Sequence, residues 1–432
     1  MRIKKIILGF CTLTVICWLI NLQFNPVAMN GRAITHEVFY LTGVLAWGMM
    51  TMAIVIAARP SWIEKITATP MDELYRWHKR LGLAAAALTA LHYFNKALMA
   101  PVLSLMTLEP VVKASRGELM GWDAFWSSLR GFAVTSSQWA TYIGLALLII
   151  TFVPWIRYNR WLSWHKLFSL LYLLLSIHCI RLMDAADALT PFGLVNITAT
   201  VLGLYYSVKL LIVGPGSDKT VKATLSRVVK NQASTLVSLR PDKPLSARSG
   251  AFAFLKTPGN EKHPFSIATI APDGELTFAV KALGDYTGQV VPALQAGQKI
   301  DIEGPWGAFF PDWANPKQCW FAGGIGIAPF CAWLNDAAHT PHGDIRLVWC
   351  IKSKENDPLY PRVQALADKA DVRLEIYESA KARLDVKTLF SKNMPQKLAV
   401  CAGEELALAV IDAFTRGGGD RKAIQREFFQ WR

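Results

Sequence analysis

Four histidines occur as two matched pairs within two apolar stretches of the chain. His78 and His92 lie fourteen positions apart, and His165 and His178 lie thirteen apart. At about 1.5 Å per residue, the members of each pair would be separated by roughly 20 Å along a helix. An ionisable side chain at membrane depth is costly unless it has a function, and imidazole nitrogens bind haem iron on either face. The spacing therefore predicts two helices that hold two haems, each between one histidine of either helix.

The two spacings are not equivalent on a regular α-helix. Fourteen residues at about 100° each return nearly to the starting face, whereas thirteen miss it by roughly 140°. We therefore expect a tightened or bulged turn between His165 and His178, or haems that are not stacked in register. A straight helix with both imidazoles on one side would contradict this expectation. The alternative is four unrelated helix-end histidines, since a Trp-His-Lys sequence at an interface more often has a structural role.

The long apolar runs are confined to the first half of the 432-residue chain, while residues 218–432 have an ordinary globular composition. This division predicts an all-α membrane bundle of six helices followed by a soluble half. The first run follows three basic residues and could instead be a secretory signal. No small-residue cleavage site is evident after Phe24, so we expect a retained helix. The six runs are residues 6–24, 38–58, 78–100, 137–156, 166–183 and 193–213.

The formal net charge of +14 is distributed around the apolar runs and is not gathered in a nucleic-acid motif. We therefore expect basic surfaces to meet anionic lipid or nucleotide phosphates, and not nucleic acid. Lys and Arg are most frequent before the first, third and fifth runs and after the sixth. The positive-inside rule then places both termini of a multi-pass membrane protein in the cytoplasm. His78 and His165 would form the inner pair, and His92 and His178 the outer pair.

The outer side of the predicted bundle carries a long connecting segment, residues 101–136. It could cover the outer haem, form the entrance for an electron acceptor, or serve only as a connector. Arg181 lies three residues after His178. Its guanidinium could pair with a haem propionate or act as a plain anchor at the outer face.

Six short β-rich segments, separated by turn residues, lie between residues 220 and 304 and predict a small antiparallel barrel. One of them begins His263-Pro264-Phe265-Ser266, an aromatic and hydroxyl-bearing strand entry that could hold a flat ring by stacking and hydrogen bonds. Lys281 and the loop Gly284–Gly288, with the Thr287 hydroxyl, could neutralise a pyrophosphate. Each stretch alone is a weak signal, because HPFS can be only a turn into a strand.

An apolar strand then leads into a glycine-rich turn that contains Gly323, Gly324, Gly326 and Pro329. A strand, a glycine loop and a helix start are the arrangement that holds nucleotide phosphates on backbone amides. The turn lacks the GxGxxG pattern, and a merely tight turn is the alternative. Strand and helix signals alternate beyond it, which predicts a parallel sheet with helices on its faces. The helices are expected near residues 358–369, 385–391 and 404–416.

The order of these motifs resembles the NADPH oxidase and ferric reductase superfamily, particularly its compact single-chain bacterial members. The resemblance covers the chain from about residue 36 and rests on the paired histidines, HPFS, GDYTG, GGIGIAPF and the terminal E-x-F-x-W. It implies a transmembrane haem domain followed by a ferredoxin reductase-like module, which consists of an antiparallel β-barrel FAD domain and an α/β nucleotide-binding domain. The implied boundaries are residues 1–215, 216–315 and 316–432.

The resemblance also implies the cofactors and their residues: two b-type haems, FAD, and NADPH or NADH as electron donor. His78, His92, His165 and His178 would bind the haem irons. His263, Pro264, Phe265 and Ser266 would face the flavin, with Lys281 and Thr287 on its phosphates. Gly323, Gly324, Gly326 and Pro329 would line the nicotinamide dinucleotide. Cys401 would lie near the nicotinamide, in a CAGEE sequence that departs from the family's Cys-Gly-Pro, and Phe429 would stack on the isoalloxazine.

The implied activity is electron transfer from cytosolic NAD(P)H, through FAD and the inner and outer haems, to an acceptor outside. We expect molecular oxygen giving superoxide, because segment 101–136 could shield the outer haem from bulky chelates. A ferric chelate reductase is the first alternative. The second is an electron-relay membrane subunit that serves a partner protein or a quinone, although no obligate protein partner is predicted. Lys352 and Lys354 could receive an adenosine 2′-phosphate or belong to a solvated loop.

Overall fold

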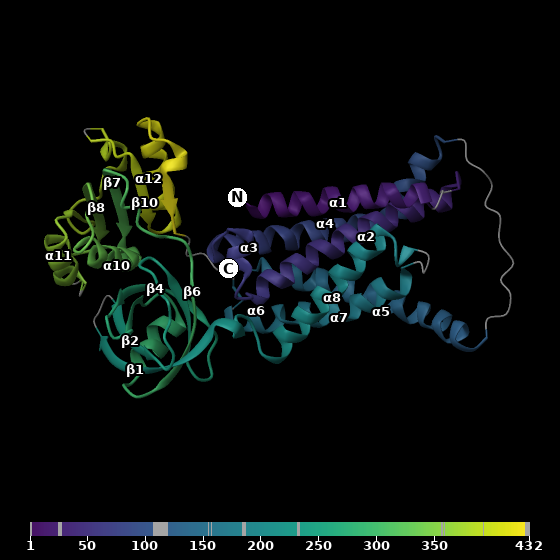
Figure 1. Cartoon of the computed structure of the whole chain (residues 1–432), viewed down its shortest axis with the longest axis horizontal. Coiled ribbons are helices and arrows are strands. Elements are labelled where there is room, and N and C mark those ends of the chain that lie inside the picture. The colour runs from purple at the N-terminus through teal and green to yellow at the C-terminus, as the bar shows by residue number, and fades with distance from the viewer. Residues whose placement is uncertain are drawn as a thin grey trace. The chain divides into compact units, whose positions relative to one another are not determined.

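The computed structural model describes residues 2–24, 28–106, 120–153, 155–156, 158–183, 187–230, 234–355, 357, 359–391 and 393–427. The chain forms two compact units (Figure 1). The first comprises Met1–Thr69 and Glu73–Ser217 and consists of helices; the second comprises Pro70–Asp72 and Asp218–Arg432 and contains the strands β1 to β11.

The long helices of the first unit account for the apolar runs of the sequence. Within the described chain, five helical segments are long and apolar enough to cross a membrane. The helix that bears His78 and His92 is longer still, 33 residues or about 50 Å, but its polar side chains exclude it from that group. Apolar helices in the first half are thus confirmed, but only five of the six predicted runs lie in helices of that kind, and the third run, residues 78–100, lies in α4. The helices are α1 (Arg2–Phe24), α2 (Gly31–Ala58), α3 (Ile63–Thr67), α4 (Met71–Leu103), α5 (Gly121–Thr151), α6 (Tyr158–His165), α7 (Leu167–Leu182) and α8 (Pro191–Ile212).

The irregularity predicted between His165 and His178 is present. Helix α6 ends at His165, and α7 begins only after Lys166. The backbone N–H of Ser169 donates to the carbonyl of Lys166 at 3.1 Å, which is the shorter i to i+3 bond of a tight turn. This turn changes the direction in which all later side chains of α7 point around the helix axis. The irregularity predicted from the thirteen-residue spacing is therefore confirmed.

Helices α2, α7 and α8 meet at a buried aromatic pair. The rings of Trp47 and Tyr172 are stacked, with centroids 3.9 Å apart and planes 12° apart. The indole N–H of Trp47 donates to the Thr200 hydroxyl at 2.8 Å. Gly203 faces the Tyr172 hydroxyl so closely that no Cβ would fit there. These contacts set the packing of α2, the helix that orients two of the histidines.

The first part of the second unit is a closed antiparallel barrel with the strand order β1-β2-β5-β4-β3-β6. The strands coincide with the six β-rich segments of the sequence, because Gly, Pro and Asn residues end each segment. Their inward side chains, among them Leu225, Ile267 and Phe278, are fully buried. The strands are β1 (Thr220–Lys230), β2 (Ser234–Pro241), β3 (Phe252–Lys256), β4 (His263–Ile270), β5 (Leu276–Lys281) and β6 (Lys299–Trp306).

The second part is a parallel five-stranded sheet with the order β11-β10-β7-β8-β9 and helices on its faces. The predicted ferredoxin reductase-like architecture is therefore confirmed. Strand β7 is central, and the glycine turn follows directly at its carboxyl end. The elements are β7 (Lys317–Gly323), α10 (Ala328–Ala337), β8 (Asp344–Ile351), α11 (Tyr360–Lys369), β9 (Arg373–Glu378), β10 (Lys397–Cys401), α12 (Glu404–Arg416) and β11 (Ile424–Arg426).

Two details of the sheet differ from the sequence interpretation. The helix expected near 385–391 is a single 3-10 turn, Val386–Thr388, which begins where the Asp385 carboxylate accepts the N–H of Lys387. Leu389 and Phe390 then turn into the core, which leaves too few residues for a regular helix. The short strand β11 was not anticipated, because three residues carry no periodic signal.

Candidate functional site

The structure brings the four histidines together in the two pairs expected from the sequence. The ring centroids of His78 and His165 are 5.9 Å apart, and those of His92 and His178 are 6.3 Å apart. Imidazoles on opposite sides of one metal have centroids roughly 6 Å apart, because each metal–nitrogen bond is about 2 Å. Each pair therefore has the separation that a shared metal requires. The rings are inclined to one another by 69° and 79°.

Helix α2 orients the two histidines of α4. The Nδ1 atom of His78 lies 2.9 Å from the carbonyl oxygen of Ala53, and that of His92 lies 2.9 Å from the carbonyl of Phe39. A carbonyl can only accept, so Nδ1 carries the proton and the lone pair of Nε2 is left for a metal. Gly43 leaves space for this arrangement, since a Cβ there would lie 3.0 Å from the His92 ring.

The histidine of α6 is held by packing. Trp161 stacks on the His165 ring with centroids 5.0 Å apart. Within the described residues, the buried Nδ1 of His165 has no hydrogen-bond partner, and a buried polar atom of this kind is normally satisfied in a completed site. The imidazole donors, their spacing and the orphaned nitrogen fit two haems with histidine on both faces.

Arg181, in the last turn of α7, contacts the first turns of α5. Its Nε donates to the carbonyl of Trp126 at 2.6 Å, and its guanidinium lies 5.4 Å from the centroid of the Trp126 ring. These contacts give Arg181 the role of an anchor. Residues from Gly121 onward belong to α5, so much of the segment 101–136 is helical, and its residues 107–119 lie outside the described residues.

In the second unit, three side chains form a buried hydrogen-bonded cluster. The Ser266 hydroxyl of β4 donates to Oε1 of Glu427 at 3.1 Å. The Cys401 thiol, at the end of β10, donates to Oε2 of the same carboxyl at 3.4 Å. The cluster links the barrel strand expected to face the flavin with the sheet strand expected near the nicotinamide. Burial raises the pKa of Glu427 to about 8, so this carboxyl holds a proton at neutral pH.

We expect Glu427 to make the second unit less stable as the pH rises from about 5 to about 8. The carboxyl ordinarily titrates at 4.5 and titrates near 8 when buried, so the folded protein binds more protons between these values. Glu427→Gln should remove this dependence. Hydrogen exchange of the β10 amides, compared between variant and wild type at each pH, should show the variant gaining relative protection with pH. The exposed Glu405→Gln is the control, and parallel profiles for all three proteins would contradict the expectation.

The HPFS and GDYTG motifs meet at Tyr286. The His263 ring stacks on the Tyr286 ring with centroids 3.9 Å apart, and the Phe265 ring lies nearly parallel to it at 6.5 Å. The Nε2 of His263 is 3.0 Å from a Glu261 carboxylate oxygen. Burial lowers the pKa of His263. Among the described strands, Pro264 pairs with β3 and not with β5, because the pairing of β4 with β5 begins at Ile267. A proline, which has no N–H to donate, is tolerated at such a strand start.

The Thr287 hydroxyl shapes the loop before it. It accepts the backbone N–H groups of Leu283 at 2.9 Å and Gly284 at 3.1 Å. The expected phosphate ligand is therefore also a structural residue of its loop. Lys281, at the end of β5, reaches toward the glycine turn: its Nζ would be 3.8 Å from a Cβ built on Gly324.

The glycine turn packs tightly against the end of β10. Gly323 ends β7, and Gly324 has a φ of +54°, which favours glycine. A Cβ on Gly326 would overlap the backbone carbonyl of Cys401. Pro329 occupies the first turn of α10, where its missing N–H costs nothing. The structure thus gathers Lys281, the glycine turn and Cys401, while Phe429 lies outside the described residues.

Sequence reasoning missed the roles of Glu427 and Tyr286. Glu427 was visible only as the first letter of the terminal motif, and its partner Ser266 is 161 positions away. Tyr286 was part of GDYTG, but its contact with His263 requires the barrel to close. The signal that the sequence offered for Glu427 was an acidic residue directly before the aromatic residues 428, 429 and 431.

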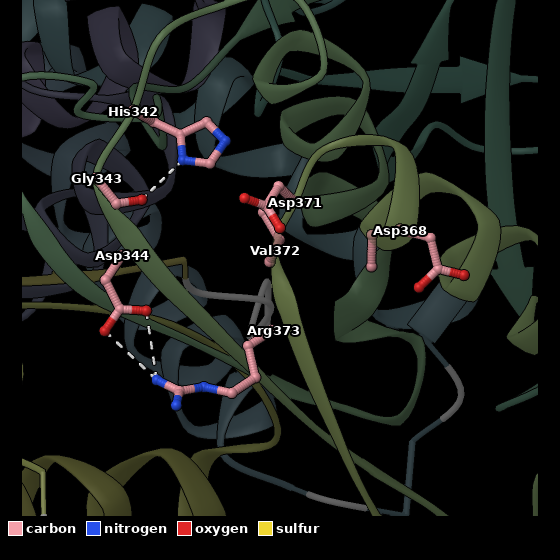
Figure 2. Close-up of a pocket in the computed structure, with 8 residues that line it drawn as sticks. His342, Gly343, Asp344, Asp368, Asp371, Val372 and Arg373 are labelled. Atoms are coloured by element: carbon pink, nitrogen blue, oxygen red, sulfur yellow. Dashed lines mark hydrogen bonds and ion pairs between the residues drawn. The ribbon is translucent and has the colours of Figure 1, made fainter.

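A surface pocket of about 700 Å³ lies elsewhere, at the amino ends of β8 and β9. Figure 2 shows the Asp344 carboxylate paired with the Arg373 guanidinium and the His342 ring bonded to the Gly343 carbonyl. Ligands of parallel sheets bind at the carboxyl ends of the strands. This pocket is therefore not the nucleotide site.

Two family models match the sequence. The model described as "Ferric reductase like transmembrane component" matches residues 42–176, and the model described as "FAD-binding domain" matches residues 219–310. The first match includes His78, His92 and His165 and ends just before His178. The second covers the barrel with HPFS and GDYTG. Fold and matches together define the class: a multi-pass membrane oxidoreductase with a flavin-binding domain.

Within that class, the chain is homologous to respiratory burst oxidases of plants and to dual oxidases of animals. It is 25% identical over 333 residues to respiratory burst oxidase homolog protein C of Solanum tuberosum, which covers 64% of this chain and 34% of that protein. It is 23% identical over 292 residues to dual oxidase 2 of Sus scrofa, which covers 62% of this chain and 18% of that protein. The chain thus spans about a third or less of these relatives. The resemblance predicted from the sequence is confirmed.

Proposed function

We propose that this protein transfers electrons from cytosolic NADPH or NADH, through FAD and two b-type haems, to an acceptor on the outer face of a bacterial inner membrane. The observation that carries the proposal is the pairing of the four histidines at centroid distances of 5.9 and 6.3 Å. The FAD-binding match and the Ser266–Glu427–Cys401 cluster support the donor side.

The chemistry would come from the cofactors, since a bound flavin takes up a hydride and gives up single electrons, and haem iron carries one electron at a time. The residues of the chain would bind and orient these cofactors. The carbonyls of Ala53 and Phe39 fix the imidazoles, and the glycine turn with Lys281 presents amides and a positive charge to phosphates. Glu427 holds a proton beside the flavin-facing strand at neutral pH. Cys401 and Phe429 would contact the nicotinamide and the isoalloxazine.

The direction of transfer follows from the charge distribution. The basic loops support an orientation with both termini in the cytoplasm, in which His78 and His165 would form the inner site and His92 and His178 the outer one. Moving an electron outward across an inside-negative membrane is favourable by about 2.3 kcal/mol per 100 mV. The proposal keeps the domain boundaries at residues 1–215, 216–315 and 316–432.

The acceptor we favour is molecular oxygen, reduced to superoxide, in line with the homology to oxidases. His92 and His178 would hold the outer haem, which would supply single electrons to the acceptor. Ferric chelate reduction is the second candidate, and the match to a ferric reductase-like component favours it.

We expect oriented vesicles or intact cells that contain the protein to reduce cytochrome c with NAD(P)H as donor, and superoxide dismutase to abolish that reduction. Reduction of ferric chelates alone would identify a ferric reductase. Activity only after a partner protein or a quinone is added would identify an electron relay. A purified protein without a dithionite-reducible b-type spectrum would contradict the proposed haem sites.

A further inference from the structure

Glu378 is a carboxylate held in a fixed position at the carboxyl end of β9. Its Oε2 accepts the backbone N–H of Lys354 at 3.0 Å, and its Oε1 accepts the ammonium of Lys381 at 2.9 Å. The side chain is only 10% exposed, whereas that of Lys381 is 76% exposed. The bond from Lys354, followed by that from Lys381, lowers the pKa of Glu378. A negative charge is therefore held between the ends of β8 and β9.

The order of the strands places this charge relative to a bound dinucleotide. Cys401 at the end of β10 is linked through Glu427 to the barrel strand β4, which marks the β10 side as the side where the flavin is reduced. The glycine turn for the phosphates follows β7, the neighbour of β10. The adenosine half must then extend over β8 and β9. Glu378, two strands from β7, lies roughly 10 Å from the phosphate turn, which an adenosine ribose can reach.

The two nicotinamide dinucleotides differ at this ribose. NADH carries a 2′-hydroxyl, and NADPH a 2′-phosphate. A fixed carboxylate accepts hydrogen bonds from ribose hydroxyls, as in other dinucleotide-binding folds, and repels a phosphate.

Three lysines lie near Glu378: Lys354, Lys381, and Lys352, whose backbone carbonyl accepts the N–H of Ala380 at 3.1 Å. The Lys354 ammonium lies 5.6 Å from the centroid of the Tyr360 ring, and the Lys381 ammonium is already paired with Glu378. An exposed ion pair such as Lys381–Glu378 is weak and breaks easily. Breaking it would still leave the carboxylate beside the phosphate.

We propose that Glu378 selects NADH over NADPH as the electron donor, by accepting the adenosine ribose hydroxyls and repelling a 2′-phosphate. This inference rests on the proposed function, because it assumes that a nicotinamide dinucleotide binds at the carboxyl edge of the sheet.

The test is anaerobic bleaching of the flavin in the full-length holoenzyme, with NADH and NADPH titrated separately. We expect wild type to bind NADH more tightly, and Glu378→Gln to shift the ratio toward NADPH by about tenfold or more, because the variant no longer places a negative charge beside the 2′-phosphate. Glu355→Gln is the matched control: it removes one negative charge from the exposed loop after β8, and should shift the ratio less than about threefold. Glu378→Ser provides a second variant in case the glutamine disturbs folding.

A wild type that prefers NADPH, or a Glu378→Gln ratio equal to that of Glu355→Gln, would overturn the inference. Calorimetry with ADP-ribose and 2′-phospho-ADP-ribose separates it from the proposed function. If ADP-ribose binds more tightly but neither dinucleotide reduces the flavin, the discrimination against a 2′-phosphate is supported and the proposed function fails. If both dinucleotides reduce the flavin and the two analogues bind equally, the inference fails and the proposed function stands.

Discussion

Replacing His178 with leucine is expected to leave the purified protein with one haem in place of two. The ring of His178 lies 6.3 Å from that of His92, and leucine offers no atom that binds iron. The inner pair should be unaffected, because His78 is about 20 Å from His92 along α4. Reduction of an outer acceptor should fall by more than about a hundredfold, since changes in supporting residues alone cost 10–100-fold.

The measurements are the haem-to-protein ratio and the rate of acceptor reduction, with anaerobic flavin reduction by NAD(P)H as the internal reference. Flavin reduction should be retained, because the second unit is unchanged. His36→Leu is the matched control. His36 is half-exposed and contacts Glu37, and it lies on α2 three residues before Phe39, whose carbonyl is bonded to His92. A His178→Leu protein that keeps two haems would exclude His178 as a ligand.

The pairing of the histidines could be predicted from the sequence because it depends on two countable properties. The spacings set the height of each imidazole, and the basic loops set the direction of each helix. The thirteen-residue spacing predicted an irregular turn between His165 and His178 or haems out of register, and the structure has such a turn at Lys166. The role of α2 could not be predicted in this way. Its carbonyls at Ala53 and Phe39 belong to the backbone, which every residue shares.

The second unit shows the same limit on what the sequence can predict. The barrel strands could be predicted because turn residues separate them, and the glycine turn because it follows an apolar strand. The Ser266–Glu427–Cys401 cluster joins residues from β4, the end of β10 and the segment after β11. Sequence position says nothing about that meeting, or about the burial that raises the pKa of Glu427 to about 8. Glu378 is likewise an ordinary acidic residue until the strand order places it.

Gly326→Ala is expected to slow flavin reduction by NAD(P)H by roughly a hundredfold, because misplacing reacting groups by about 1 Å has effects of that size. A Cβ on Gly326 would lie 2.7 Å from the carbonyl carbon of Cys401 and 3.2 Å from its sulfur. The nearest atom belongs to the backbone, so no side-chain rotation relieves the overlap. Either the glycine turn or the end of β10 must move, and both are expected to contact the dinucleotide.

Gly403→Ala is the matched control for this change. Gly403 follows β10, the strand that ends at Cys401. It has a φ of −55°, and its Cβ would lie in open space. Stopped-flow reduction of the flavin should be close to wild type in Gly403→Ala and slow in Gly326→Ala, with equal haem content in both. Dithionite, which needs no nucleotide, should reduce the flavin at the same rate in all three proteins. A Gly326→Ala protein with normal hydride transfer would show that the contact between the turn and Cys401 does not position the dinucleotide.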